Sequence, residues 1–475
     1  MKINAPTKAL ELFAYHLAQE MLHSTDGLGE LTLATKFVEG VYHAHATLNE
    51  KSADESASLK EHFTDKRAEN VACGKALFAL FSQIHPLSVP YGTLVGVRPV
   101  KIALFYYEHG LKRTEVQKLL IQDYCMQKRT AALLCDLAQL ESETSRSLCS
   151  NDAMLYLSIP FCPSRCRYCS FVSHSAPKQL ALLPEYLLRM QEELQETAEL
   201  FSTTKRHLRA VYLGGGTPGL LEKADLHDLF ETIHRHFPLA ESVEYTAELG
   251  RPDTVTKEKC AELTSLGVGR ICINPQSLDD NVLKLNGRHH TADDFYRAYE
   301  FAKSANIPSI NTDLIAGLVG DTPDGFLNTL EKILNLSPEN LTVHALCKKR
   351  ASDEENAVSN DEEGHWSAAM KLAQTACIKN GYRPYYLYRQ KNTIANLENL
   401  GYAKEGHDCL YNIAMMEDLC DVFAVGAGAM TKLRKNTEDG YTMIRLPSYK
   451  YPAEYLNDPQ KGRLNRKKAK ELCME

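Results

Sequence analysis

The middle of the chain alternates between short apolar runs and longer segments whose apolar residues recur every three or four positions. The short runs are β-branched or aliphatic and predict strands, whereas the longer segments predict amphipathic helices. Six strands separated by five helices indicate βα units and a parallel sheet. Their length, about 190 residues, favours a partial (β/α)6 TIM-like barrel over a full eight-fold one. The strands are expected at 154–159, 210–213, 242–248, 270–274, 309–315 and 340–346, and the helices at 184–201, 223–236, 253–266, 292–304 and 322–336.

The segments on either side of this core follow other patterns. Residues 1–150 show helical periodicity in several places, such as 8–22 and 129–140, and the polar stretch 49–70 predicts a loop or a solvated helix. Residues 347–475 are less regular, and the basic run 463–470 predicts a solvated tail. We therefore expect an α/β protein in three parts. These are a mainly helical accessory domain at 1–150, the barrel at 151–346, and a smaller α+β region at 347–475 that covers the substrate.

Composition and charge narrow the class of protein. Apolar residues make up 44% and charged residues 24% of the chain, as in an ordinary globular protein. The formal net charge of −7 disfavours broad binding to nucleic acid or to anionic membranes, so no nucleic-acid partner is expected. The N-terminus lacks the apolar run of a secretory signal, and no run approaches the ~18 residues of a membrane helix. We expect a cytoplasmic protein with no membrane span.

Three of the fourteen cysteines are clustered. The other eleven are scattered, mostly among apolar neighbours, and are interpreted as small buried hydrophobes in a reducing compartment. Cys162, Cys166 and Cys169 follow the first predicted strand with the spacing C-x3-C-x2-C. Three thiolates on one short loop can hold three corners of a [4Fe–4S] cluster, which leaves one iron open for chemistry. A structural zinc site with His174 as a fourth ligand is the alternative.

Glycines and isolated polar residues follow the next strands. The second strand runs into Gly214-Gly215-Gly216-Thr217-Pro218, where residues without a Cβ let the backbone approach a ligand closely. Glu248 ends the third strand, Gln276 and Arg288 follow the fourth, and Asp313 lies within the fifth. A charge inside an aliphatic strand is costly unless it is paired. Glu248 and Asp313 are therefore expected to contact a ligand or to form ion pairs, and a salt bridge between Arg288 and Asp313 is the structural alternative.

The cysteine spacing, followed in order by the glycine run and these polar residues, resembles the radical S-adenosylmethionine (SAM) superfamily. Within it, the order and spacing resemble the oxygen-independent coproporphyrinogen III oxidase family, in its HemZ-type branch. The resemblance implies a [4Fe–4S] cluster on the three clustered cysteines, with SAM as the second cofactor. It also implies contacts to the amino, carboxylate and ribose groups of SAM from Gly215, Gly216, Thr217, Glu248, Gln276, Arg288 and Asp313. Tyr156 matches a tyrosine that the family places beside the cluster, and we assign it as catalytic.

The family resemblance also implies a reaction. Two propionates of coproporphyrinogen III would be oxidatively decarboxylated to vinyls, giving protoporphyrinogen IX in haem biosynthesis. A low-potential electron donor and an electron acceptor, neither identified by the sequence, would take part. A substrate with four propionates needs cations, and arginine matches the geometry of carboxylates. The candidates are Arg389, Lys391, Lys349 and Arg350, with ordinary surface charge as the alternative for each.

One position departs from the oxidase pattern. Oxidases of this family tend to carry a further cysteine two places after the triplet, where this chain has Phe171. The Cys169-Ser170-Phe171 ending resembles the haem-chaperone branch more closely. A protein that binds and delivers haem without decarboxylating a porphyrinogen is therefore the competing hypothesis. Radical modification of RNA is disfavoured by the acidic balance of the chain.

Overall fold

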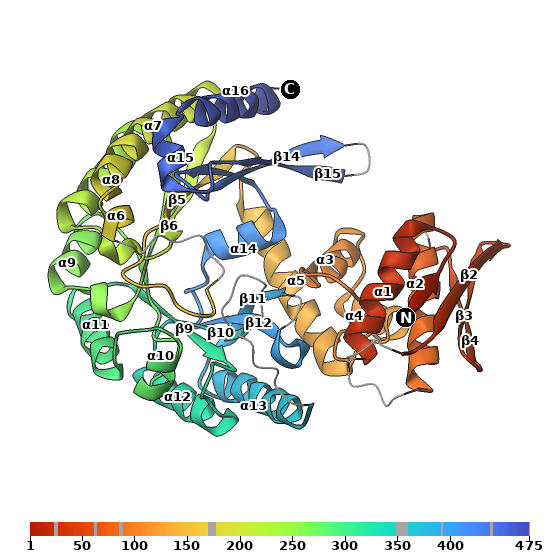
Figure 1. Cartoon of the computed structure of the whole chain (residues 1–475). Coiled ribbons are helices and arrows are strands. Elements are labelled where there is room, and N and C mark those ends of the chain that lie inside the picture. The colour runs from red at the N-terminus through yellow and green to blue at the C-terminus, as the bar shows by residue number, and fades with distance from the viewer. Residues whose placement is uncertain are drawn as a thin grey trace. The chain divides into compact units, whose positions relative to one another are not determined.

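The computed structural model describes residues 1–22, 27–60, 64–84, 89–169, 177–347, 360–390, 393–437 and 440–474. The chain divides into two compact units (Figure 1). One comprises residues 1–143 with 387–389, and the other comprises residues 144–386 with 390–475. In the described ranges, none of the helices combines the length and the apolar character that crossing a membrane requires.

The six predicted strands are neighbours in the sheet of the second unit, and every pair among them is parallel. In Figure 1 the connecting helices lie along the outer side of this curved sheet. The predicted partial (β/α)6 architecture is thereby confirmed. The strands are β5 (Asp152–Ile159), β6 (His207–Gly215), β7 (Leu239–Gly250), β8 (Arg270–Ile273), β9 (Ser309–Ala316) and β10 (Asn340–Ala345). The helices are α7 (Leu183–Thr203), α8 (Lys223–His236), α9 (Lys257–Ser265), α11 (Ala292–Ser304) and α12 (Pro323–Leu336), with the short α6 (Pro177–Leu180) and α10 (Asp280–Leu285).

Helix α12 shows how the sequence sets these elements. The Thr322 hydroxyl accepts a hydrogen bond from the Gly325 N–H at 3.0 Å, and Pro323 occupies the first turn, where its missing N–H costs nothing. Phe326 and Ile333 are among the residues buried against the sheet. Ser337 ends the helix in a left-handed conformation with φ of 56°.

The C-terminal region extends the sheet at both edges, which the sequence did not predict. Beyond β10 lie β12 (Glu398–Ala403), which is antiparallel to it, and β11 (Arg383–Arg389). Beyond β5 lies the parallel strand β13 (Asp421–Val425), followed by β14 (Met430–Thr437) and β15 (Gly440–Pro447). The barrel strands therefore have β-partners on both sides, and β5 and β10 are not edge strands.

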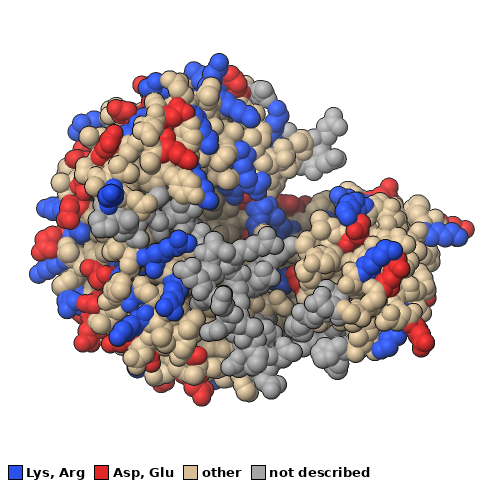
Figure 2. Space-filling model, in the orientation of Figure 1, with Lys and Arg blue, Asp and Glu red and all other residues tan. Residues whose placement is uncertain are grey.

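The predicted solvated tail at 463–470 is wrong. It belongs to helix α16 (Gln460–Met474), in which Ala469 is buried and Arg466 donates to the Glu193 carboxylate of α7 at 2.6 Å. Figure 2 shows that Lys and Arg side chains gather over α16, whereas both signs of charge are mixed over the outer helices. The remaining helices of this region are α13 (Asn360–Lys379), α14 (Leu410–Glu417) and α15 (Pro452–Asn457).

The first unit contains a sheet as well as the expected helices. Strands β1 (Lys2–Asn4), β2 (Glu30–Val38), β3 (Val41–Leu48) and β4 (Lys51–Ser58) pair in that order. The prediction of a loop or a solvated helix at 49–70 is wrong for residues 51–58, which form β4, whereas residues 65–70 are helical and begin α2. Several buried positions of these strands are small and give a weak apolar signal, for example Ala44 between the exposed His43 and His45 on β3. The helices are α1 (Lys8–Leu22), α2 (Asp65–Ser82), α3 (Val100–Glu108), α4 (Arg113–Tyr124) and α5 (Lys128–Ser147).

None of the fourteen cysteines, all of which lie in the described ranges, takes part in a disulfide bond. Among the eleven scattered ones, Cys149 is exposed, and three others are partly exposed: Cys125, Cys347 and Cys473. The interpretation as buried hydrophobes holds for the rest, namely Cys73, Cys135, Cys260, Cys272, Cys377, Cys409 and Cys420.

Candidate functional site

Partly exposed polar residues mark one face of the parallel sheet. Strands β5, β9 and β10 each have a single residue that is not buried, and these are Tyr156, Asp313 and His344. On the strands between them, Tyr212 of β6 and Glu248 of β7 are partly exposed next to buried neighbours. Residues on interior strands gain such exposure only where the sheet borders an open space. The space beside these strands is therefore lined by hydroxyls, carboxylates and an imidazole.

The three clustered cysteines lie on the segment Phe161–Cys169, the cysteine loop, at the carboxyl end of β5. Cys162 is buried, and the other two sulfur-bearing side chains are partly exposed. The Cys169 N–H donates to the Cys166 carbonyl at 3.1 Å, and the Arg167 N–H donates to the Asn286 carbonyl at 3.1 Å. The loop is thus folded by its own backbone and tied to the segment after α10.

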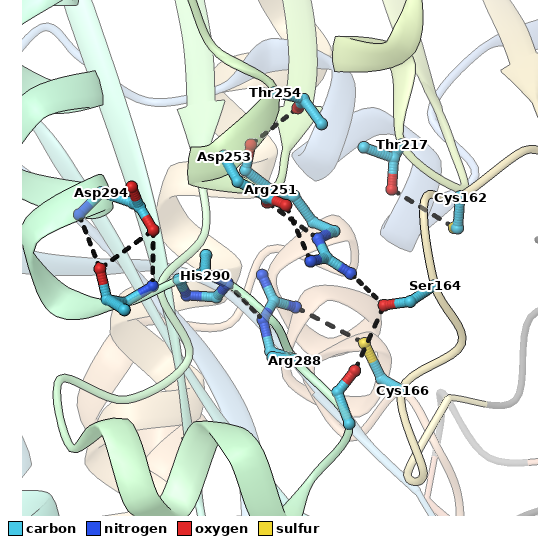
Figure 3. Close-up of polar contacts among 12 residues, drawn as sticks. Cys162, Ser164, Cys166, Thr217, Arg251, Asp253, Thr254, Arg288, His290 and Asp294 are labelled. Carbon is cyan, nitrogen blue, oxygen red and sulfur yellow. Dashed lines mark hydrogen bonds and ion pairs between the residues drawn. The ribbon is translucent and has the colours of Figure 1, made fainter.

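A buried arginine fastens the middle of the cysteine loop (Figure 3). Arg251, just after β7, is 3% exposed and donates to the Ser164 hydroxyl. Its Nε and Nη2 atoms donate to the two oxygens of Asp253 at 3.0 and 2.9 Å. The Ser164 hydroxyl donates in turn to the Gly287 carbonyl at 3.3 Å. A forked arginine–carboxylate pair has a defined geometry, so the loop is held in place by protein groups alone.

A second buried arginine, Arg288, approaches the same loop (Figure 3). Its Nη2 atom donates to the Asn274 carbonyl at 2.7 Å, and its Nη1 atom donates to the Tyr168 hydroxyl at 3.0 Å. The Nη1 atom also lies 3.9 Å from the Cys166 sulfur. In the described structure no ion pair joins Arg288 to Asp313, so the salt bridge considered as the structural alternative is not formed.

The glycine run makes room for the cysteine loop. Gly215 has φ of 114°, which side-chain-bearing residues rarely adopt. A Cβ on Gly216 would lie 2.5 Å from the Phe161 carbonyl oxygen and 2.9 Å from the Cys162 sulfur. Thr217, the next residue, donates its hydroxyl to that sulfur at 3.3 Å. At these positions glycine is needed for the contact between two loops of the protein, before any ligand is considered.

The charges of two carboxylates, Glu248 and Asp313, act on each other. Burial, together with the charge of Asp313, raises the pKa of Glu248 to about 7. The Tyr212 hydroxyl donates to Glu248 Oε2 at 3.0 Å and opposes this shift. Asp313 accepts from the Asn311 amide at 2.8 Å and lies 3.6 Å from His344 Nε2. The pair is therefore only partly neutralised by protein groups.

Gln276 completes this group of acceptors. Its backbone bridges to β9, because its N–H donates to the Asp313 carbonyl at 3.0 Å and its carbonyl accepts from the Ile315 N–H at 3.0 Å. The side-chain oxygen Oε1 is buried, and none of the described residues donates a hydrogen bond to it. A buried acceptor without a donor is costly, and such atoms are rare. Glu248, Gln276 and Asp313, the acceptor group, fit a ligand that brings hydrogen-bond donors.

Three tyrosine rings stack beside Glu248. The centroids of Tyr212 and Tyr411 are 4.6 Å apart, and Tyr156 lies 6.2 Å from Tyr212 and 6.1 Å from Tyr411. Tyr411 belongs to α14, whose first N–H groups donate to the Glu244 carboxylate. The resemblance stated for Tyr156 did not extend to its two partners, because Tyr411 comes from the irregular C-terminal region. Other site residues missed by the sequence are Ser164, Tyr168, Arg251, Asp253, Asn274, His290 and His344.

Of the four predicted substrate cations, only Arg389 lies within the described residues. Arg389 belongs to the first unit, where it pairs with Glu20 at 3.1 Å and lies over the Tyr91 ring at 4.4 Å. A guanidinium compensated in this way offers no free charge to a propionate, so the geometry does not support the predicted substrate role of Arg389. The three other candidates, Lys349, Arg350 and Lys391, lie outside the described residues.

A cluster and a single metal ion make different demands on the cysteine loop. No three Cys, His, Asp or Glu side chains in the described ranges stand close enough together to ligate a single metal ion. A cubane makes a different demand, because each thiolate binds its own iron. His174, the fourth ligand of the zinc alternative, lies outside the described residues, so metal analysis must decide that alternative.

Among known protein families, the radical SAM superfamily matches residues 156–333. The chain is 35% identical over 350 residues to the oxygen-independent coproporphyrinogen-III oxidase-like protein HemZ of Bacillus subtilis. This match covers 72% of this chain and 70% of that relative. This chain belongs to the radical SAM superfamily, in its HemZ-type branch. The cofactors of the superfamily are a [4Fe–4S] cluster and SAM, so the predictions of family, fold and cofactors are confirmed.

Other relatives are named as haem chaperones. This chain is 29% identical over 316 residues to the heme chaperone HemW of Haemophilus influenzae, and the match covers 64% of this chain and 75% of that relative. Its fold is similar to that of the solved coproporphyrinogen III oxidase HemN of Escherichia coli. The TM-score is 0.53 with 20% identity, over 68% of this chain and 73% of that structure.

Proposed function

We propose that this protein oxidatively decarboxylates coproporphyrinogen III to protoporphyrinogen IX without oxygen. Two arguments support the proposal. The first is the similarity to an oxidase-like relative over 70% of that relative's length. The second is the arrangement of the cysteine loop, whose three sulfurs could hold a cluster, at the same end of the sheet as the acceptor group. The single observation that most directly supports a bound cosubstrate there is the buried Gln276 oxygen, to which no described residue donates a hydrogen bond.

Different residues of the site would have different roles. Cys162, Cys166 and Cys169 would hold the cluster, which together with SAM supplies the radical chemistry that removes a hydrogen atom from the propionate. The remaining steps are binding and orientation. Glu248, Gln276 and Asp313 would accept hydrogen bonds from the ribose hydroxyls and the amino group of SAM. All three accept at the carboxyl ends of neighbouring strands, where ligands of such sheets bind.

Other groups would complete the binding of SAM. The backbone of Gly215, Gly216 and Thr217 lines the end of β6, beside the cysteine loop. Arg288, held by the Asn274 carbonyl and the Tyr168 hydroxyl, would direct its positive charge to the carboxylate of SAM. Tyr156 would pack beside the cluster as the outer ring of the tyrosine stack. An electron donor and an electron acceptor, both outside this chain, would complete the reaction.

Delivery of haem without decarboxylation is the second candidate function. Phe171 stands where oxidases of the family tend to carry cysteine, and HemW relatives match 64% of this chain. In this case the cluster and SAM site would remain, and a haem would take the place of the porphyrinogen.

One anaerobic assay separates the two functions. The reconstituted protein is incubated with SAM, a low-potential reductant and coproporphyrinogen III, and the porphyrin products are oxidised and analysed by mass spectrometry. We expect loss of two carboxyl groups as carbon dioxide, and no loss with Cys166→Ala, whose absorption at about 400 nm should also disappear. SAM cleavage without decarboxylation, together with tight haem binding, would instead establish the haem-delivery function.

A further inference from the structure

The hydroxyl of Thr217 points at a cluster ligand rather than into the open space. It donates to the Cys162 sulfur at 3.3 Å, and the two side chains are 1% and 8% exposed (Figure 3). The family resemblance placed Thr217 with the residues that bind SAM. The structure gives its side chain a different neighbour.

The contact is built into the backbone of both loops. The Thr217 N–H donates to the Phe161 carbonyl at 2.7 Å, and the Gly216 N–H donates to the Ile159 carbonyl at 2.8 Å. The missing Cβ of Gly216 lets the end of β6 come this close to the Cys162 sulfur. These backbone contacts between the ends of β5 and β6 therefore hold the hydroxyl opposite the sulfur, and no ligand is needed to keep it there.

We propose that Thr217 is a positioning residue for the cluster, whose hydroxyl stabilises the reduced state through the sulfur of Cys162. A hydrogen bond to a thiolate ligand withdraws electron density from the iron, and it favours the state with one more negative charge. Donors of this kind are among the groups that set the reduction potential of iron–sulfur clusters. The inference rests on a cluster held by Cys162, and it does not depend on which porphyrin is bound.

A side-chain donor is described for two of the clustered sulfurs, and the two donors differ in chemical type. Cys162 receives a neutral hydroxyl at 3.3 Å, and Cys166 has the Arg288 guanidinium at 3.9 Å, near the limit for a hydrogen bond to sulfur. The closer contact is the one that a conservative substitution removes without changing charge. This makes Thr217 the better probe of how the protein tunes the cluster.

The test compares T217V, T217S and wild type in anaerobically reconstituted protein without any porphyrin. Valine has nearly the shape of threonine but no hydroxyl, and serine restores the hydroxyl. T246V is the matched control, because the Thr246 hydroxyl on β7 is also buried but forms no hydrogen bond with any described residue. Iron and sulfide content are measured first, then the midpoint potential by redox titration followed by electron paramagnetic resonance (EPR), then SAM affinity.

We expect a more negative potential in T217V, the wild-type potential in T217S and T246V, and SAM affinity within two-fold of wild type in all three. An unchanged potential in fully loaded T217V would overturn the proposal. Weaker SAM binding at unchanged potential would also overturn it and assign the hydroxyl to SAM.

If T217V retains no iron, T217A removes the hydroxyl without placing a branched methyl beside Cys162. Loss of iron in both variants would assign Thr217 to cluster assembly instead. Because no porphyrin is present, failure of the decarboxylation assay leaves this test intact.

Discussion

The cysteine loop and the acceptor group lie at the same end of the same sheet, but their polar groups are satisfied to different degrees. In the cysteine loop, Ser164 is hydrogen-bonded to Arg251 and to the Gly287 carbonyl, and Arg251 forms two bonds with Asp253. In the acceptor group, the described part of the chain offers the Gln276 side-chain oxygen no donor, and burial together with the charge of Asp313 raises the pKa of Glu248 to about 7.

The fold holds the cysteine loop with its own hydrogen bonds, whereas it leaves acceptors available in the acceptor group. A loop that receives a metal cluster has to present its sulfurs before the cluster arrives, so protein groups hold it. A group that binds a cationic cosubstrate has to keep acceptors free, and this costs stability in the empty protein. The predictions below test this contrast, from the largest expected effect to the smallest.

Arg251→Met should remove the fastening of the cysteine loop. It leaves Asp253 without its partner and the Ser164 hydroxyl without a donor. Loss of one member of a largely buried pair lowers the free energy of unfolding by about 3 kcal/mol. Urea denaturation of the cluster-free protein measures the loss, and iron analysis after reconstitution should show reduced loading.

Arg297→Met is the matched control for Arg251→Met. Arg297 pairs with Asp294 on α11, but its side chain is 61% exposed, so the loss should stay below about 0.5 kcal/mol. Equal effects of the two substitutions would show that the cysteine loop gains nothing from Arg251.

Glu248 should make the stability of the empty protein fall as the pH rises. Its pKa is raised from 4.5 to about 7, so between these values the folded protein holds a proton that the unfolded chain has released. The cost is absent below pH 4.5, grows toward pH 7 and is constant above. Allowing for the partial exposure of Glu248, it amounts to about 2 kcal/mol.

Thermal unfolding between pH 5 and pH 8 measures this slope against Glu248→Gln, in which it should be absent. SAM should bind more tightly as the pH rises through 7, since its donors favour the ionised carboxylate. A wild-type slope equal to that of the variant would remove Glu248 as the source of the cost.

Asp313→Asn should separate binding from stability. We expect SAM affinity to fall at least about ten-fold, which is about 1.4 kcal/mol. The empty protein should be at least as stable as wild type at pH 8, because the repulsion between Asp313 and Glu248 is relieved. Isothermal titration with SAM and denaturation are compared with Asp228→Asn, an exposed aspartate on the outer helix α8. Lower stability with unchanged affinity would make Asp313 a structural residue.

Tyr212→Phe should have a smaller effect on the same site. It removes one hydrogen bond to Glu248 and lets the pKa of that carboxyl rise further, so SAM affinity should fall about five-fold, or about 1 kcal/mol. Tyr245→Phe on β7 is the control, because the buried Tyr245 hydroxyl has no hydrogen-bond partner in the described ranges. SAM affinity that falls equally in both variants would point to general loosening of the sheet.

Much of the site could be predicted because its residues follow a strand order. The alternation of short aliphatic runs and amphipathic segments is a local signal, and the cysteine spacing lies within eight residues, Cys162–Cys169. The strand ends then place Glu248, Gln276 and Asp313 at one end of the sheet, because parallel strands share their direction.

The parts that the sequence did not predict depend on distant segments. Tyr411 reaches the site only because Glu244 of β7 holds the first turn of α14. Strand β13 becomes a partner of β5 across more than 250 residues of chain, and its short run carries no mark of that pairing. Arg251 falls between the predicted strand at 242–248 and the predicted helix at 253–266, and its partner Ser164 lies 87 residues earlier, so no local pattern indicates the contact.

EPR of the reduced protein with and without SAM tests the account most directly. Anaerobically reconstituted wild type should show the signal of one reduced [4Fe–4S] cluster, and SAM should shift its g values by binding at the open iron. Asp313→Asn should need at least about ten times more SAM for the same shift. Zinc in place of iron and sulfide, or a cluster spectrum that saturating SAM leaves unchanged, would contradict a three-cysteine cluster beside an acceptor group built for SAM.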